Sequence, residues 1–224
     1  MRNLINTWIH VVVSWFYKDV DVTVGQEEKC LAQAREIQGV ISDWAGNEKT
    51  EKISLGENCS TSYNIKTSGN KNASYPFDWV GTSPETVEHI LRDDFNKFLD
   101  LDLMYSKKIR CGHHVYHDDL WGHRDPKLFP HDYTYYQRTV ERMRKILKSD
   151  TPIIFVCTVL NETEKRPMWA KGFNKEFKVL TNQSLDHFQS LIDYLISVKP
   201  DSKFMFVEEY TEGDFELSIK HRTE

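Results

Sequence analysis

The 224-residue chain contains only four cysteines, at positions 30, 59, 111 and 157, and no CxxC pair. A disulfide framework requires a higher density of cysteine, so we expect free thiols, a reducing compartment and a cytoplasmic location. The zinc pattern HExxH is also missing. Asp100-Leu-Asp102 matches the letters of a DxD metal motif, but we expect it to close a helix. These absences predict that the protein uses no metal and no other cofactor.

Long runs of basic or of apolar residues are missing as well. The net charge is −5, and the arginines at 138, 142 and 144 form only a local cluster, which argues against a general nucleic-acid binder. The apolar stretch from Trp8 to Tyr17 is too short to span a bilayer, and no small-residue cleavage site follows it. We expect a buried or interfacial helix there, with a membrane-surface anchor as the alternative.

The order of the segments predicts one domain with an extension. Residues 1–50 are expected to form an N-terminal helical extension, because residues 26–44 show helical periodicity before a polar turn. Residues 51–224 are expected to form the main domain. Its last ten residues are charged, and we expect them to fray.

Alternation of strands and helices within residues 51–224 indicates an α/β fold. The predicted architecture is a single three-layer domain with a mainly parallel central sheet. Ligands of such sheets bind beyond the carboxyl ends of the strands, where Gly56–Cys59, Thr158–Glu162 and Glu208–Tyr210 would meet. We expect strands at 52–55, 108–110, 115–117, 152–157 and 203–207, and helices at about 59–67, 84–97, 134–147 and 185–198.

Cys59 is the first candidate for chemistry. It follows a predicted strand and Gly56, at the expected start of a helix. Unpaired N–H groups and the positive end of the helix dipole stabilise a thiolate at such a position. Asn58 could donate its side-chain amide to an oxyanion. A small structural cysteine beside a glycine turn is the alternative.

A histidine-rich segment from residue 111 to residue 132 is the second candidate. His131 has Asp132 beside it in sequence, and imidazole is the usual general base near neutral pH. Asn161, just after a predicted strand, could orient that histidine. A surface or structural role for each histidine is the alternative, and His113 and His117 with nearby carboxylates could instead bind a metal.

Two further features could contact a substrate. Asp78 lies among aromatic residues, where a buried carboxylate with a perturbed pKa would be functional, although it could equally cap a turn. Arg138 and Arg142 are four residues apart on a predicted helix. Two guanidinium groups on one helix face can hold a phosphate or a carboxylate, and ion pairing with neighbouring carboxylates is the alternative.

Taken together, five segments resemble, in their order, an uncharacterised family named for papain-like cysteine peptidases. The resemblance covers about residues 51–210, with LGxNC and FDW as its most specific motifs. It implies a thiol nucleophile at Cys59 and a histidine base at His131. Cys157 stands where related sequences tend to carry arginine, and Arg166 could supply that charge. The segments are Ile53-Ser-Leu-Gly-Glu-Asn-Cys59, Tyr75-Pro-Phe-Asp-Trp79, Phe129-Pro-His-Asp132, the arginine-bearing helix and Ile153-Ile-Phe-Val156.

Three functions stay open at this point. The first is a cysteine-dependent hydrolase or acyl transferase with a Cys59–His131 dyad, oriented by Asp132 or Asn161. The second is a glycosyltransferase-like or sugar-binding enzyme in which Cys59 is structural, because members of the family often accompany glycosyltransferases in polysaccharide gene clusters. The third is a non-catalytic interaction module. The expected partner is a peptide, acyl or glycan substrate.

Overall fold

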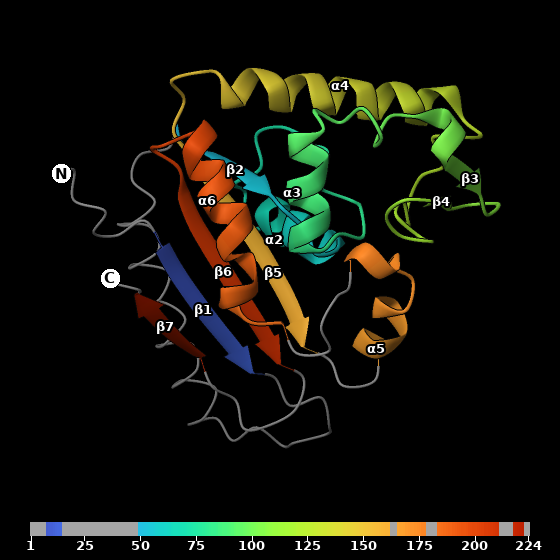
Figure 1. The fold of residues 1–224 in the computed structure, drawn as a ribbon. Helices are drawn as coiled ribbons and strands as arrows, with labels where there is room; N and C mark the ends of the chain where they lie inside the picture. The colour runs from blue at the N-terminus through green and yellow to red at the C-terminus, as the bar shows by residue number, and fades with distance from the viewer. Residues whose placement is uncertain (1–7, 15–48, 162–164, 178–182, 211–216, 222–224) are drawn as a thin grey trace.

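The computed structural model of the protein describes residues 8–14, 49–161, 165–177, 183–210 and 217–221 (Figure 1). Five strands form one sheet in the order β2-β5-β6-β1-β7. The first four strands of that order run parallel, and β7 is antiparallel to β1. The predicted α/β class with a mainly parallel sheet is therefore confirmed. The strands are β1 Trp8–Ser14, β2 Glu51–Ser54, β5 Ile153–Asn161, β6 Lys203–Tyr210 and β7 Leu217–His221.

Strand β1 corrects the prediction for the N-terminal apolar stretch. Residues 8–14 form no helix but pair with β6 from Trp8↔Phe204 to Ser14↔Tyr210. The β-branched residues Ile9 and Val11–Val13 favour a pleated strand over a helix, which explains the error. The chain end also differs from the expected frayed tail, because β7 pairs with β1. The helix predicted for residues 26–44 lies outside the described residues.

Proline takes the first position of two of the helices. In α3, the Ser83 side chain accepts a hydrogen bond from the Thr86 N–H, and Pro84 is the first helical residue. In α4, Pro130 takes the first position, so the helix starts four residues earlier than the sequence predicted. No helix in the described residues is long and apolar enough to cross a membrane. The α-helices are α2 Cys59–Thr67, α3 Pro84–Arg92, α4 Pro130–Leu147, α5 Lys165–Ala170 and α6 Gln189–Val198.

The core lies between the sheet and these helices, with α6 in front of β6 and α4 across one end of the sheet (Figure 1). Phe155 of β5 stacks on Phe204 of β6 with 5.6 Å between ring centroids. A second aromatic cluster lies below α4, where Phe98 contacts Trp121 and Tyr136. Phe188, which precedes α6, packs against Phe206 of β6 with 5.0 Å between ring centroids, and because aromatic side chains bury much apolar surface each, this contact helps to hold α6 on the sheet.

A small antiparallel pair of strands lies beside this core. It consists of β3 Met104–Ser106 and β4 Cys111–His113, so the strands predicted at 108–110 and 115–117 are misplaced. Three 3-10 turns complete the described elements: Leu101–Leu103, Lys175–Phe177 and Leu185–Phe188. The last of these precedes α6, so the predicted helix over 185–198 is divided in two.

The carboxyl ends of β2, β5 and β6 meet at one edge of the sheet because these strands are parallel. Strand β2 ends at Ser54, but the next two residues still lie beside β5 and form one backbone hydrogen bond each with it. The Leu55 N–H donates to Val156 O at 2.9 Å, and the Thr158 N–H donates to Gly56 O at 3.3 Å. The turn that follows leads directly into α2, so this edge positions Cys59.

Candidate functional site

The turn between β2 and α2 requires glycine at position 56. Its φ is +100°, and a Cβ there would lie 1.9 Å from the Thr82 Oγ1. The Thr61 hydroxyl donates to the Gly56 carbonyl at 2.5 Å and accepts from the Thr158 N–H at 2.8 Å. The turn is therefore held by α2, by β5 and by the segment at Thr82, and it gives Cys59 a fixed position.

Cys59 is the first residue of α2, as the sequence predicted. Asn58 is the N-cap, with extended backbone, and its side-chain oxygen accepts from the Ser60 N–H at 2.8 Å. That bond uses the oxygen of Asn58, so its amide nitrogen is the atom that could still donate to an oxyanion. Cys59 is partly exposed, whereas Cys111 and Cys157 are buried. Burial raises the pKa of Cys111 to about 12 and that of Cys157 well above its ordinary value.

A buried ion pair fixes the other side of the turn. Arg166 of α5 donates to both carboxylate oxygens of Glu57, at 2.8 and 3.1 Å, and also to Gln183 at 3.3 Å. Only 3% of the Arg166 side chain and 1% of the Glu57 side chain are exposed. Burial raises the pKa of Glu57, and Arg166 opposes that shift. Arg166 thus contacts the turn itself, with its charge already paired.

His131 lies in the first turn of α4, and three quarters of its side chain (75%) is exposed. Its Nε2 is 3.5 Å from the Asp132 Oδ1, and its ring packs against Phe129. Asp132 is buried and already accepts from Arg124 at 2.6 Å and from the Asp125 N–H at 3.0 Å. Among the described residues no hydrogen bond joins the Cys59 thiol to a histidine ring. The Cys59–His131 dyad therefore stays a prediction.

Asn161 is the last residue of β5, and its side chain lies outside the described part of the structure. The backbone places it three residues beyond Thr158, which contacts the Gly56 carbonyl. At a rise of about 3.3 Å per residue, Asn161 lies roughly 10 Å further along the strand than this contact. Its role as an orienting residue stays a prediction.

Asp78 is fully buried and forms an ion pair with Lys71, with 2.6 Å between the Lys71 Nζ and the Asp78 Oδ2. The same oxygen accepts from the Tyr75 N–H at 2.8 Å, so Asp78 does cap the turn of its own segment. Its Oδ1 has no hydrogen-bond partner among the described residues. Burial raises the pKa of Asp78, and Lys71 opposes the shift. Lys71 also donates to the Ser62 hydroxyl at 2.8 Å, which connects this segment to α2.

Arg138 and Arg142 lie on α4 but do different things. Arg142 donates to the Ser74 carbonyl and so holds the segment that precedes Tyr75. Arg138 is exposed, and its guanidinium lies 6.0 Å from the centre of the Tyr135 ring. Within the described part of the chain, no contact brings the two guanidinium groups together at one ligand position.

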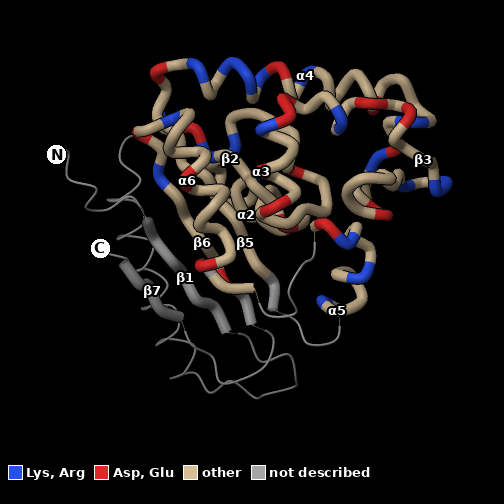
Figure 2. The backbone as a smooth tube through the Cα atoms, in the orientation of Figure 1, with Lys and Arg blue, Asp and Glu red and all other residues tan. Residues whose placement is uncertain are grey.

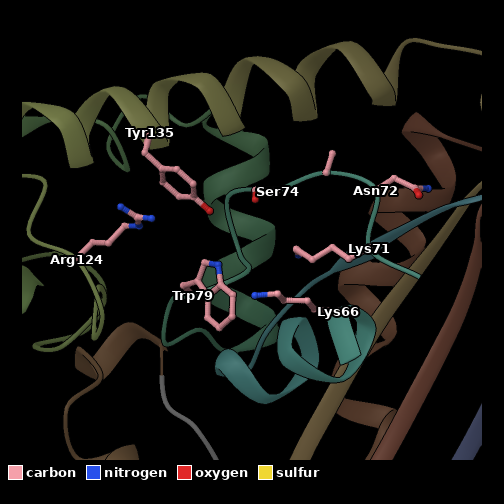
Figure 3. Close-up of a pocket in the computed structure, with 8 residues that line it drawn as sticks. Lys66, Lys71, Asn72, Ser74, Trp79, Arg124 and Tyr135 are labelled. Atoms are coloured by element: carbon pink, nitrogen blue, oxygen red, sulfur yellow. The ribbon is translucent and has the colours of Figure 1, made fainter. Parts of the chain in front are cut away.

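A pocket of about 330 Å³ opens between α2, the segment 71–79 and α4 (Figure 3). Figure 3 shows the Lys66 side chain extending toward Trp79, with Tyr135 and Arg124 on the opposite wall. Arg124 lies 4.0 Å above the Tyr135 ring. The lining residues are Lys66, Lys71, Asn72, Ala73, Ser74, Trp79, Arg124 and Tyr135.

The pocket and Cys59 share one face of α2. Cys59, Ser62 and Lys66 are spaced by three and four residues, which places them in line along a helix. Ser62 contacts Lys71 and Lys66 lines the pocket, so this face of α2 looks toward the segment 71–79. At 1.5 Å per residue, Cys59 and Lys66 are about 10 Å apart along the axis.

The buried histidines serve the structure. The His113 ring contacts the Lys97 carbonyl at 2.9 Å and accepts from the Val115 N–H. The His117 ring contacts the Trp169 carbonyl at 3.1 Å and accepts from the Asp119 N–H. Burial lowers the pKa of His113 to about 4 and lowers that of His117. Both rings are thus neutral with their nitrogens in use, and no cluster of three metal-binding side chains occurs in the described residues.

Several residues of this region could not be found from the sequence. Nothing in the sequence pairs Glu57 with Arg166, which are 109 positions apart. No sequence motif includes Lys66, Arg124 or Tyr135, and only the tertiary fold brings these residues to one pocket. The motif YPFDW, in contrast, could be recognised in the sequence, and it supplies both Asp78 and the pocket residue Trp79.

A thiol at a helix N-terminus, at the carboxyl edge of a parallel sheet, defines the site as that of a candidate thiol enzyme. Residues 50–129 match a protein family described as "Putative papain-like cysteine peptidase (DUF1796)". The resemblance inferred from the motifs is therefore confirmed over this part of the chain. At the level of the family, the match indicates a cysteine hydrolase. It includes Asn58, Cys59 and Asp78 and ends before His131.

One curated relative is similar over a shorter stretch. "Uncharacterized protein R408" of Acanthamoeba polyphaga mimivirus is 33% identical over 70 residues, which are 31% of this chain and 31% of that protein. The chain thus spans about a third of the length of this relative. No solved structure matches the chain.

Proposed function

We propose that the protein is a cysteine-dependent hydrolase with Cys59 as its nucleophile and a peptide as its substrate. The observation that carries this proposal is the position of Cys59, partly exposed at the first residue of α2 within the family match. Free N–H groups at a helix N-terminus favour a thiolate, which is the nucleophilic form of cysteine.

The reaction follows from the groups around this thiol. The Cys59 thiolate attacks the substrate carbonyl, and the Cys59 N–H with the Asn58 amide donates to the oxyanion that forms. A histidine protonates the leaving amine, and water then releases the acyl group from the sulfur. We propose His131 as this histidine, positioned by Asp132 or Asn161, because its ring is exposed and its Nε2 lies 3.5 Å from the Asp132 Oδ1.

His123 is a second candidate for the base. Its ring lies 6.0 Å from that of Trp79, which lines the pocket. His123 is exposed, unlike His113 and His117. Substitution of His123 and of His131 by alanine, one at a time, would separate them. The catalytic histidine is the one whose replacement lowers kcat by about 100-fold or more, while the other replacement leaves kcat near the native value.

Alkylation tests the nucleophile directly. In a Cys30→Ser background we expect iodoacetamide to label Cys59 first, because Cys111 and Cys157 are buried with raised pKa values. We expect Cys59 to react faster than a free cysteine peptide, as a partly exposed cysteine at a helix N-terminus generally does. Peptide mapping by mass spectrometry locates the label. If Cys59 reacts no faster than the free peptide and Cys59→Ala retains hydrolase activity, the proposal is wrong.

A sugar-nucleotide-binding enzyme in which Cys59 is structural is the second candidate function. One observation favours it, namely the pocket in which cationic side chains lie beside Trp79 and Tyr135. Calorimetric titration with common sugar nucleotides tests this function, and heat that persists in Cys59→Ala would support it over hydrolysis.

A further inference from the structure

The pocket beside α2 carries positive charge on a chain that is acidic overall. Lys66, Lys71 and Arg124 line it, while the net charge of the chain is −5. Figure 2 shows further Lys and Arg positions along α4, which forms one wall. Two carboxylates neutralise part of this charge, because Asp78 pairs with Lys71 and Asp132 pairs with Arg124. Lys66 has no carboxylate partner among the described residues, so one positive charge is left over.

The chemical group that carries the remaining positive charge determines which anion the pocket suits. Arg124 already donates to Asp132, and Arg142 already donates to the Ser74 carbonyl. Each of these guanidinium groups therefore already has one N–H engaged, and Arg124 also stacks on the Tyr135 ring. Lys66 offers a single ammonium group, which suits a singly charged carboxylate. The nearby faces of Trp79 and Tyr135 suit the apolar stem that carries such a group.

The distance to Cys59 indicates where this carboxylate lies in a substrate. Cys59 and Lys66 are separated by about 10 Å along the face of α2. An extended peptide rises about 3.3 Å per residue, so a group in the pocket is about three residues from a carbonyl at Cys59. Resting on the proposed hydrolase function, we propose that the pocket is a specificity site that binds an acidic side chain about three residues from the scissile bond.

Binding is measured separately from catalysis, so the two proposals can fail separately. The Cys59→Ala protein is titrated by calorimetry with blocked heptapeptides of alanine that carry one Glu, or one Gln at the same place. A third titration uses inorganic phosphate. At low ionic strength we expect the Glu peptide to bind about fivefold more tightly than the Gln peptide, as a partly exposed ion pair gives. This ratio is expected to fall toward one in 0.5 M salt.

Two variants assign the effect to the pocket. Lys66→Gln is expected to remove the preference for Glu, and Lys145→Gln, an exposed lysine elsewhere on α4, is expected to keep it. Equal binding of both peptides, an unchanged preference in Lys66→Gln, or phosphate binding tighter than the Glu peptide would each overturn the proposal. A Lys66-dependent preference without peptide cleavage by the native enzyme would uphold the pocket and overturn the hydrolase.

Discussion

Replacement of Arg166 by methionine is the sharpest test of how the turn before Cys59 is held. Methionine fills a similar volume and keeps the apolar contacts, but it removes the hydrogen bonds to Glu57 and Gln183. Because the Glu57 side chain is only 1% exposed, water cannot replace the lost guanidinium. The variant must therefore either bury an unpaired carboxylate or protonate it.

The expected cost is large for a single substitution. Breaking a buried ion pair by removing one partner destabilises a protein by about 3–5 kcal/mol. For a chain of this length, each kcal/mol lowers the melting temperature by about 2–4 °C, so Tm should fall by roughly 6–20 °C. The surface pair of Arg110 and Asp119 is a matched control, with 54% and 26% of the side chains exposed. Arg110→Met should cost about 1 kcal/mol or less.

The pH dependence gives the test a second readout. Burial raises the pKa of Glu57 above its ordinary value of 4.5, so just above that pH the folded state binds more protons on average than the unfolded state. Stability from this group therefore falls as the pH rises. Removing Arg166 raises the pKa of Glu57 further. The difference in the free energy of unfolding between the native protein and the variant should therefore increase from pH 5 to pH 7.5.

Urea unfolding followed by tryptophan fluorescence at both pH values measures this gap. Adding Glu57→Gln to Arg166→Met should abolish the widening, because no titrating group is left at the turn. The reasoning is refuted if Arg166→Met costs no more than Arg110→Met, or if its cost is the same at pH 5 and pH 7.5.

Two further predictions concern glycine and histidine. Gly56→Ala should cost about 2–4 kcal/mol in urea unfolding, because its Cβ would meet Thr82 and its φ is positive. Gly69→Ala, which also has a positive φ but open space around it, should cost only about 1 kcal/mol, and equal costs would exclude the steric explanation. The folded-state pKa of His113 is about 4, so the unfolded chain takes up the proton first as the pH falls below 6.5. The titration of His113 should lower the free energy of unfolding by about 1.5 kcal/mol between pH 6.5 and pH 5. This decrease should be absent in His113→Gln and present in His114→Gln.

The sequence predicted the elements that depend on local chemistry. The start of α2 at Cys59 follows from the break at Gly56, and the start of α3 follows from Ser83 and Pro84. The buried strands β5 and β6 follow from continuous apolar runs. Each of these signals lies within a few residues of its effect, so no knowledge of the fold was required.

Predictions that depended on distant partners failed or stayed open. Residues 8–14 were predicted as a helix although their β-branched residues favour a strand, and their pairing with β6, almost 200 residues later, places them in the sheet. The histidine-rich segment suggested chemistry, but carbonyl and N–H partners from the tertiary fold make His113 and His117 structural. The pocket combines residues of four separate segments (α2, residues 71–79, the loop with Arg124 and α4), and their spacing in the sequence does not predict that they meet.

The place of β1 in the sheet has a consequence for how the chain is made. On the ribosome, Trp8–Ser14 emerges about 200 residues before its partners Lys203–Tyr210 and Leu217–His221. At about 5–20 residues per second, the strand waits roughly 10–40 s before either neighbour exists. During that time a valine-rich segment with unpaired backbone groups is open to pairing with other chains. Synthesis should thus be the period in which this protein most needs a chaperone, and the closure of the sheet around β1 should be the last step of its folding.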